Sequence, residues 1–387
     1  MMIFFDNAAG SHPKPPQVKE ALVASCDEYG ANPGRGAYKM SLAASRLLFT
    51  TRENLARFFN CADINRLVFT PGATASLNMA LRGILQPGDH VIYSGMEHNA
   101  LWRPLMLFQQ EGLIKCTKTE ADRWGYVQAD DFAKAIRPET KLIICLHASN
   151  VTGSVQPIAD IGAIAKKHSI AFLVDTAQSA GLLPIDMQKM NISLLVFAGH
   201  KGLYGPAGIG GLAIAPDTEL LPLILGGTGS NSMDWRQPDF YPDRLESGSL
   251  NMPGIAGLSG AMRFLTQLGR QEIYEYTMEL CWRFCEQVAQ IDGLRLFVPP
   301  ATEARERVPV VSLLIEGMDV SEITWLLDDE YDIAVRGGLH CTPLAHKTIG
   351  TLDSGTVRFS FGAFNSKKEV DTAVKALAKI AKENIKK

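Results

Sequence analysis

Lys201 directly follows an apolar run and precedes a glycine-rich segment, within Val196-Phe197-Ala198-Gly199-His200-Lys201-Gly202. Burial at the end of a strand destabilises an ammonium ion and frees the amine, which is the nucleophile that forms a Schiff base with a carbonyl cofactor. A lysine at a strand end can also extend its stem to solvent, so the residue alone leaves both interpretations open. The glycines lack the order of a P-loop and the strand–GxGxxG–helix context, so they do not favour a nucleotide site.

Asp175 ends a second apolar run, in Leu173-Val174-Asp175-Thr176-Ala177-Gln178. An anionic carboxylate that faces the ring nitrogen of pyridoxal phosphate (PLP) keeps that nitrogen protonated, and the ring can then accept the electrons left by an α-proton. Asp175 could instead cap the following helix, but capping does not explain why polar residues follow several apolar runs at once. We therefore favour a role in a site.

Two further segments could complete such a site. Thr70-Pro71-Gly72-Ala73-Thr74-Ala75-Ser76 has the pattern of a tight turn from a strand to a helix, whose free N–H groups suit a phosphate. A plain helix cap explains the same residues, and the two roles are compatible. His98 follows Glu97. A lone histidine beside an apolar run is ordinarily a core residue, so only the neighbouring polar segments support placing His98 in the site.

Cys341 lies on a glycine-rich stretch, Val335-Arg336-Gly337-Gly338-Leu339-His340-Cys341-Thr342-Pro343, beside an arginine and a histidine. Cationic neighbours favour the thiolate, which is the nucleophilic form of cysteine. Zinc needs about four ligands, and no second Cys or His pair with ligand spacing lies near Cys341. Cys281 and Cys285, one helical turn apart, fit a helix core better than a metal site.

Short apolar runs that alternate with helical patterns must position these residues. Such alternation predicts an α/β fold with a largely parallel, doubly wound sheet, in which ligands bind beyond the carboxyl ends of the strands. Five polar segments each follow one of the runs, so we expect them to form one site: Gly72-Ala73-Thr74, Glu97-His98-Asn99, Ser149-Asn150, Asp175-Thr176-Ala177-Gln178 and Gly199-His200-Lys201. The runs are Leu67–Phe69, His90–Tyr93, Lys141–Leu146, Ile170–Val174, Leu194–Phe197 and Gly211–Ala215.

The pattern changes near residue 255 to longer helical stretches around a shorter β portion. We expect a large domain over residues 15–255 and a smaller α+β domain formed by residues 1–14 and 256–387, since single cores stop growing at roughly 250 to 300 residues. Strands are expected at Val310–Ile315, Ile333–Val335 and Val357–Phe361. Ser366 and Glu369 have the spacing of a capping box before a final amphipathic helix, which we expect to dock on the domain.

Composition excludes several classes of protein. With 387 residues, 46% hydrophobic and 20% charged, the chain is that of a globular protein. Scattered Lys and Arg and a net charge of −3 argue against a nucleic-acid partner. The apolar stretches are too short for a membrane span, the first thirty residues show no export pattern, and the seven widely spaced cysteines do not resemble a disulfide framework. We expect a cytoplasmic protein.

The ordered set of segments resembles the PLP-dependent cysteine desulfurases of the class V aminotransferase group, which have fold type I with a seven-stranded type of sheet. It is closer to the Suf-type, selenocysteine lyase-like branch than to the NifS/IscS branch. The resemblance runs nearly end to end. Its segments are Asp6-Asn7-Ala8-Ala9, Gly72-Ala73-Thr74, Glu97-His98, Ser149–Gly153, Val174–Ser179, Gly199-His200-Lys201, Glu246-Ser247-Gly248 and Arg336–Cys341.

The resemblance implies a role for each site residue. Lys201 would hold PLP covalently, with Asp175 at the pyridine nitrogen, Gln178 at the ring hydroxyl and His98 stacked on the ring. The phosphate would be bound by the residues Ala73, Thr74 and His200, with Thr228 reaching across from the second subunit of a homodimer. Asn150 and Arg358 would grip the carboxylate of L-cysteine, a task suited to a guanidinium. Cys341 would take the sulfur as a persulfide, leaving L-alanine.

Two features qualify what the resemblance implies. Ala198 stands where the family usually has Ser or Thr, so one phosphate hydroxyl is missing, at a cost of about 0.5 to 1.5 kcal/mol. Only Thr342–Thr356 separate Cys341 from the next strand, which indicates the short-loop form that depends on a sulfur-acceptor protein. The alternatives are a selenocysteine lyase acting on L-selenocysteine, a kynureninase-like hydrolase or an ordinary aminotransferase on the same scaffold, and a PLP-free binding protein.

Overall fold

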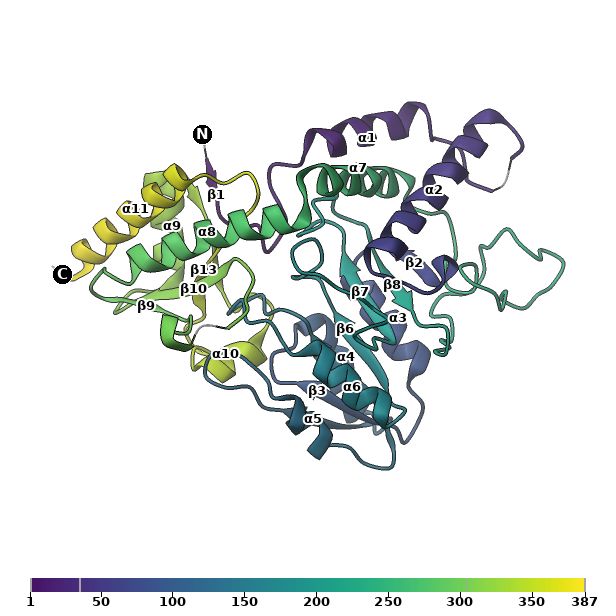
Figure 1. The fold of residues 1–387 in the computed structure, drawn as a ribbon, viewed down its shortest axis with the longest axis horizontal. Coiled ribbons are helices and arrows are strands. Elements are labelled where there is room, and N and C mark those ends of the chain that lie inside the picture. Colours follow the sequence, from purple (N-terminus) through teal and green to yellow (C-terminus); the bar gives the residue numbers. More distant parts are fainter. Residues whose placement is uncertain (1, 35, 304, 386–387) are drawn as a thin grey trace.

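The computed structural model describes residues 2–34, 36–303 and 305–385. Its largest sheet has seven strands in the order β2-β8-β7-β6-β5-β3-β4 (Figure 1). Neighbours from β7 through β4 pair in parallel, whereas β8 pairs antiparallel with both β2 and β7, which confirms a largely parallel sheet. The bounds are β2 Leu67–Thr70, β3 His90–Ser94, β4 Lys115–Thr119, β5 Thr140–Leu146, β6 Ala171–Asp175, β7 Leu194–Ala198 and β8 Gly210–Ile214.

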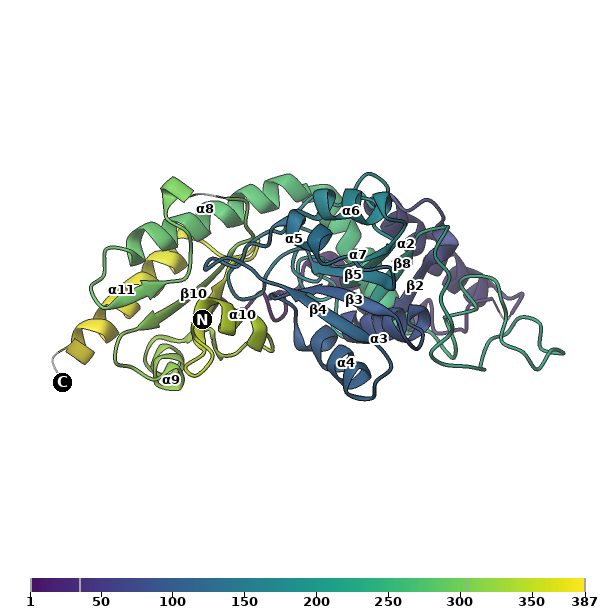
Figure 2. The same ribbon diagram turned by 90° about the horizontal axis from the view of Figure 1, so that it is seen from below.

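Helices cover both faces of this sheet and create two cores. Leu142 and Ile144 pack in one core and Ile143 in the other, because successive strand residues point to opposite faces. One core contains α3 and α4, and the other contains α1, α2, α6 and α7, with α5 beside α6 (Figures 1 and 2). The bounds are α1 Pro16–Asp27, α2 Lys39–Phe58, α3 Ala73–Ile84, α4 Asn99–Gln110, α5 Ala129–Lys134, α6 Ile158–Lys167 and α7 Met252–Leu268.

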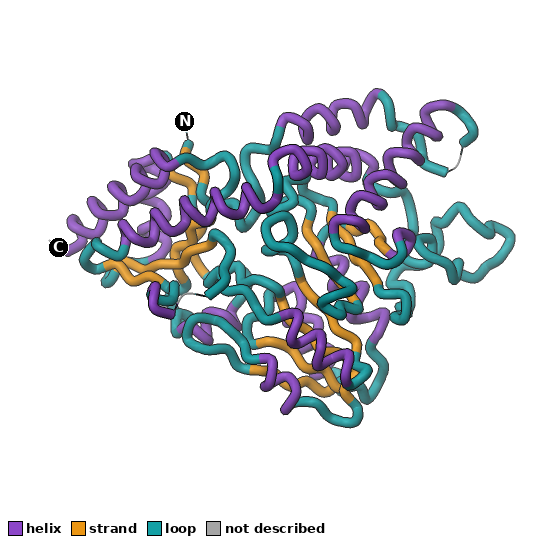
Figure 3. The backbone as a smooth tube through the Cα atoms, in the orientation of Figure 1, coloured by secondary structure: helices purple, strands orange, loops and turns teal. Residues whose placement is uncertain are grey.

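A second, antiparallel sheet with the order β12-β13-β10-β9 forms the smaller part, covered by helices (Figure 3). Strand β1 pairs in parallel with β11 beside it. The elements are β1 Ile3–Phe4, α8 Arg270–Val288, β9 Leu294–Leu296, β10 Val310–Ile315, α9 Val320–Tyr331, β11 Ile333–Ala334, β12 Arg336–Gly338, α10 Pro343–Ile349, β13 Thr356–Ser360 and α11 Lys367–Ile385. Two 3-10 turns are Ile64–Arg66 and Ala301–Glu303.

The last helix begins as the sequence predicts. The Glu369 carboxylate accepts the Ser366 N–H at 2.7 Å, and the Ser366 hydroxyl accepts the Glu369 N–H at 3.3 Å, which is a reciprocal capping box. Val370, Ala373 and Leu377 then bury one face of α11 in the core of the smaller part. Within the described residues, no helix is both long and apolar enough to cross a bilayer.

Core packing suggests where the two domains divide. Helix α7 packs on α1 and α2 and shares a core with the seven-stranded sheet, whereas the second core begins within α8, at Met278. Phe5, on the N-terminal segment, belongs to that second core. We therefore propose a boundary at Gly269, between α7 and α8, rather than at residue 255, with the N-terminal segment in the smaller domain.

Candidate active site

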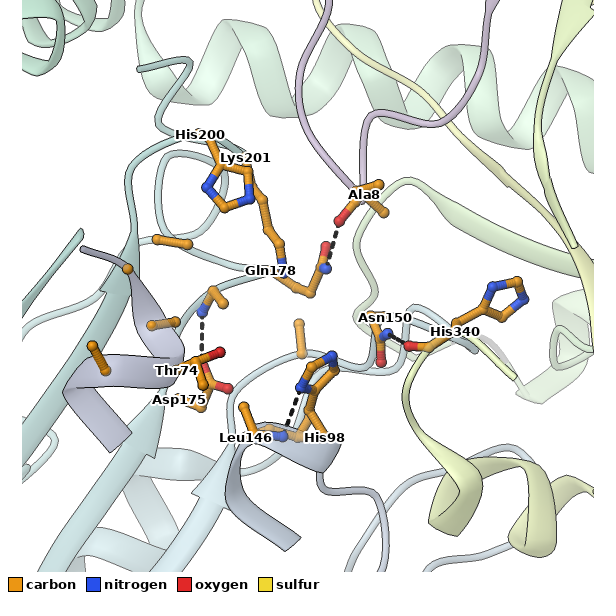
Figure 4. A pocket seen from close by; sticks show the side chains of 18 of the residues that line it. Ala8, Thr74, His98, Leu146, Asn150, Asp175, Gln178, His200, Lys201 and His340 are labelled. Atoms are coloured by element: carbon orange, nitrogen blue, oxygen red, sulfur yellow. Dashed lines mark hydrogen bonds between the residues drawn. The ribbon is translucent and has the colours of Figure 1, made fainter. Parts of the chain in front are cut away.

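A cavity of about 590 Å³ opens where the carboxyl ends of β5, β6 and β7 face the smaller sheet. It brings together nine of the predicted residues, which arrive from strand ends, helix starts and β13. Figure 4 shows several of them pointing toward one another. The nine are Ala73, Thr74, His98, Asn150, Asp175, Gln178, His200, Lys201 and Arg358.

Lys201 and Asp175 both line the cavity, and their charges attract each other. Burial lowers the pKa of Lys201, and the attraction of Asp175 only partly opposes this, so the free amine is favoured relative to an exposed lysine. Burial raises the pKa of Asp175, while the Ala177 N–H and Lys201 act in the opposite sense. Asp175 Oδ1 accepts that N–H at 2.9 Å, but residues 177–182 form turns rather than a helix, so the helix-capping alternative is wrong and the bond stabilises a turn beside the cavity.

His98 has a second function that its sequence context did not reveal. Its Nδ1 accepts the Ala100 N–H at 3.0 Å and thereby caps α4. Burial, followed by the charge of Lys201, lowers the pKa of His98 to about 4, so the ring is neutral at pH 7. Because Nδ1 is an acceptor, the proton lies on Nε2, and the ring is fixed in one orientation at the cavity wall.

Glu97, next to His98, is a fully buried carboxyl that sequence reasoning left without a role. Its Oε1 accepts the Ser94 hydroxyl at 2.6 Å and the Leu146 N–H at 2.8 Å, while Oε2 has no partner among the described residues. Burial raises the pKa of Glu97 to about 8, with a smaller contribution in the same direction from Asp175. A neutral carboxylic acid therefore lies behind the cavity wall at pH 7.

The start of α3 forms an anion-binding end of the cavity. Gly72 has φ +152°, a backbone conformation that side chains disfavour, and no side chain caps the N–H groups that follow it. Burial lowers the pKa of His200 to about 4, and its buried Nδ1 has no hydrogen-bond partner among the described residues. Ala198 forms part of the same wall. The free N–H groups at the start of α3 are donors that fit the oxygens of a phosphate group.

Arg358 forms the opposite end and has a partner that the sequence did not predict. One guanidinium nitrogen contacts Asp6 Oδ1 at 2.6 Å, another donates to the Asn150 carbonyl at 3.1 Å, and the buried Nε has no partner among the described residues. Asp6 lies in the quoted segment Asp6–Ala9, but 352 positions separate it from Arg358. The free Nε leaves a guanidinium donor for an incoming carboxylate.

Cys341 lies at the edge of this arrangement. Its side chain is exposed and is not part of the cavity lining, but Arg336 and His340 line the cavity, and an Arg336 nitrogen lies 3.7 Å from the Cys341 sulfur. The following segment is stiffer than the expected loop, because Pro343–Ile349 form α10 and bury Leu344 and His346. The helix escaped prediction because it is only seven residues long.

Gln178 and Thr228 differ in how they relate to the cavity. Gln178 lines it and donates from Nε2 to the Ala8 carbonyl at 2.9 Å. Thr228 lies instead in a separate hollow of about 470 Å³ with Arg52 and Glu246, so within one chain it does not join the cavity. Exposed apolar residues surround it in sequence: Leu221, Leu223, Ile224, Leu225, Met233, Trp235 and Phe240.

Comparisons with known proteins agree on one family. The family model described as Aminotransferase class-V matches residues 3–373. A probable cysteine desulfurase of Methanothermobacter thermautotrophicus is 32% identical over 97% of this chain and 94% of its own. A cysteine desulfurase of Yersinia pseudotuberculosis is 31% identical over 98% and 94%.

Solved structures agree with the sequence comparisons. The apo cysteine desulfurase of Thermococcus onnurineus superposes with a TM-score of 0.91 at 32% identity, covering 99% of this chain and 95% of that one. The cysteine desulfurase CsdA of Escherichia coli, in an S-sulfonic acid form, gives 0.86 at 29% identity with the same coverage.

Proposed function

Because the chain belongs to the aminotransferase class-V family, we propose that it is a PLP-dependent cysteine desulfurase, which converts L-cysteine to L-alanine and stores the sulfur as a persulfide on Cys341. One observation carries this proposal. Lys201 and Asp175 both line a cavity whose edge holds an exposed thiol beside Arg336. An ordinary aminotransferase needs the lysine and the aspartate but has no use for that thiol.

The cavity residues fit PLP. Lys201 would attach it, Asp175 would face its ring nitrogen, and His98 and Gln178 would contact the ring. The phosphate would lie against the N–H groups of Ala73 and Thr74, with His200 beside them. When bound, PLP supplies an electron-accepting ring that stabilises negative charge next to the substrate α-carbon.

The protein's own groups would then divide the work. Arg358 would bind the substrate carboxylate through its free Nε, with Asn150 alongside. The Lys201 amine would take the α-proton, because burial lowers its pKa and so favours the free amine that can accept a proton. The Cys341 thiolate would attack the substrate sulfur. A sulfur–sulfur bond forms as the carbon–sulfur bond breaks, the carbon keeps the electron pair, and it is protonated to the methyl group of alanine.

We further propose a homodimer in which Thr228 completes the phosphate site of the second subunit. The exposed apolar residues around Thr228 support this, because such a patch on a soluble surface marks an interface. The seven cysteines are all unpaired, which supports a cytoplasmic location. A sulfur-acceptor protein is the expected partner, and we propose L-selenocysteine as a second substrate.

Alanine release from L-cysteine by the PLP-loaded protein tests the proposal. The wild type should form alanine and carry one extra sulfur on the Cys341 peptide in mass spectra. Cys341→Ser should bind PLP normally but form neither product, since its hydroxyl is a poor nucleophile toward sulfur. Alanine formation by Cys341→Ser from L-selenocysteine alone would favour a selenocysteine lyase, and persulfide elsewhere on that variant would remove Cys341 from the mechanism.

A further inference from the structure

The turn that carries Cys341, residues 339–342, has an unusual backbone. His340 has φ +49° and Cys341 has φ +59°, so two consecutive residues with side chains adopt the left-handed conformation. L residues adopt this conformation at a cost in free energy, and a pair in succession persists only when surrounding contacts hold it. The turn is closed by the Thr342 N–H, which donates to the Leu339 carbonyl at 2.8 Å.

Both peptide groups that flank Cys341 are tied to the large domain. The His340 carbonyl accepts Asn150 Nδ2 at 2.8 Å, and the Cys341 carbonyl accepts the Asn99 backbone N–H at the start of α4, also at 2.8 Å. Figure 4 shows the bond between Asn150 and His340. The thiol is therefore exposed on a backbone that is anchored on both sides.

Thr342 fixes the Asn150 amide in the orientation that this anchor needs. The Thr342 hydroxyl is fully buried and donates to Asn150 Oδ1 at 2.8 Å, so the amide nitrogen faces the His340 carbonyl. The Arg358 guanidinium donates to the backbone carbonyl of Asn150 at 3.1 Å, which holds the main chain of that residue as well. A methyl group in place of the hydroxyl would leave a buried amide oxygen without its donor, which favours release of the amide.

We propose that Asn150 and Thr342 are positioning residues that latch the Cys341 turn to the large domain, so that Cys341 reaches the cavity but cannot swing outward with its sulfur. The inference rests on the proposed function for the identity of the sulfur cargo. The latch itself is a property of the folded chain. An acceptor must consequently come to Cys341, because the turn cannot deliver sulfur to a distant partner.

The test compares how fast Cys341 reacts with two maleimides of different size, N-ethylmaleimide and a maleimide that carries a long polyethylene glycol. Both react with the thiolate, so the ratio of the two rates cancels any change in thiol reactivity and reports reach alone. Thr342→Val should raise the ratio of bulky to small reagent by about three- to tenfold, the factor that corresponds to one typical hydrogen bond. Thr342→Ser keeps the hydroxyl and should retain the wild-type ratio.

Cys26 provides the internal reference, because it is exposed on α1 in the large domain and is not part of the latch. Peptide mass spectrometry of the PLP-loaded protein follows both cysteines in one sample. Asn150→Ala removes the same latch from its other end and should also raise the ratio at Cys341, so a folding defect in one variant leaves the other as a test. If a folded Thr342→Val or Asn150→Ala protein keeps the wild-type ratio of bulky to small maleimide labelling rates at Cys341, the proposed latch is wrong.

The labelling result does not depend on turnover. If the wild type forms no persulfide from L-cysteine, the proposed function fails. The ratio of the two maleimide labelling rates still tests the latch in that case. If persulfide forms and the ratio does not change, the latch fails alone. In kinetics, Thr342→Val should slow the first turnover without a matching rise in KM, and Thr342→Ser should restore it. A general structural defect would not be rescued by the smaller hydroxyl residue.

Discussion

Replacing Glu97 with glutamine should change how the stability of the protein depends on pH. The wild-type carboxyl is fully buried, its Oε1 accepts two hydrogen bonds, and its Oε2 has no partner among the described residues. Its pKa is about 8 in the folded protein against an ordinary value of 4.5. Between these two pKa values, the folded state therefore keeps a proton on Glu97 that the unfolded state has released.

The sign and size of the effect follow from this difference. Because the unfolded state binds fewer protons between the two pKa values, the free energy of unfolding falls as pH rises through that window. For Glu97 alone, the fall between about pH 5 and about pH 8 is about 3 to 4 kcal/mol, since each pKa unit is worth about 1.4 kcal/mol. Glutamine does not titrate, but its amide leaves buried N–H groups unpaired at a constant cost of about 1 to 3 kcal/mol.

The two stability curves should therefore cross. Urea unfolding of wild type and Glu97→Gln, matched for PLP content, should find the variant less stable at about pH 5 and equal or more stable at about pH 8. Infrared difference spectra should contain a protonated carboxyl band at pH 7 that the variant lacks. Parallel curves across this range, together with no such band, would refute the argument that Glu97 is neutral.

Four further outcomes follow from the site. Borohydride reduction of PLP-loaded Lys201→Ala should place no pyridoxyl group on the cavity peptides and turnover should vanish, whereas undiminished turnover would exclude Lys201 as the attachment point. Ala198→Ser should tighten PLP binding about two- to tenfold in a fluorescence titration by adding one hydroxyl, and an unchanged Kd would remove that residue from the phosphate site. Rapid mixing with L-cysteine should release a first alanine equivalent quickly and later ones slowly, with acceleration by an acceptor protein or a strong reductant; a linear, reductant-independent course contradicts slow persulfide release. Light scattering should find a homodimer, and an active monomer would rule out the role of Thr228.

The sheet could be predicted from sequence because its inner strands are buried on both faces. Each of the six predicted apolar runs matches a strand to within one residue at either end. The seventh strand, β4, was missed because Lys115–Thr119 is polar and lies at the edge of the sheet. Strands β9 and β12 have only three residues each and carry too little pattern to be recognised.

The site was predicted as a set of residues but not as a set of contacts. Eight of the nine residues converge on the cavity because they end or follow strands, or cap or begin helices, at one edge of the large sheet, and Arg358 joins them from within β13. The pairing of Asp6 with Arg358 and the bond from Asn150 to His340 join segments far apart in sequence, and no local pattern records such contacts. The capping role of His98 was hidden because histidine is not a common helix cap.

The N-terminal segment pairs with residues that the ribosome adds more than three hundred positions later. Ile3 pairs with Ile333, the Ser360 N–H donates to the Phe5 carbonyl, and the Ser11 N–H donates to the His200 carbonyl. Because a ribosome adds residues in order, residues 3–5 cannot form all of these contacts until residue 360 has been synthesised. The ion pair of Asp6 with Arg358 likewise requires both segments to have been synthesised. A nascent chain can thus form its large sheet early, but it completes the substrate side of its cavity only after residue 358 has been synthesised.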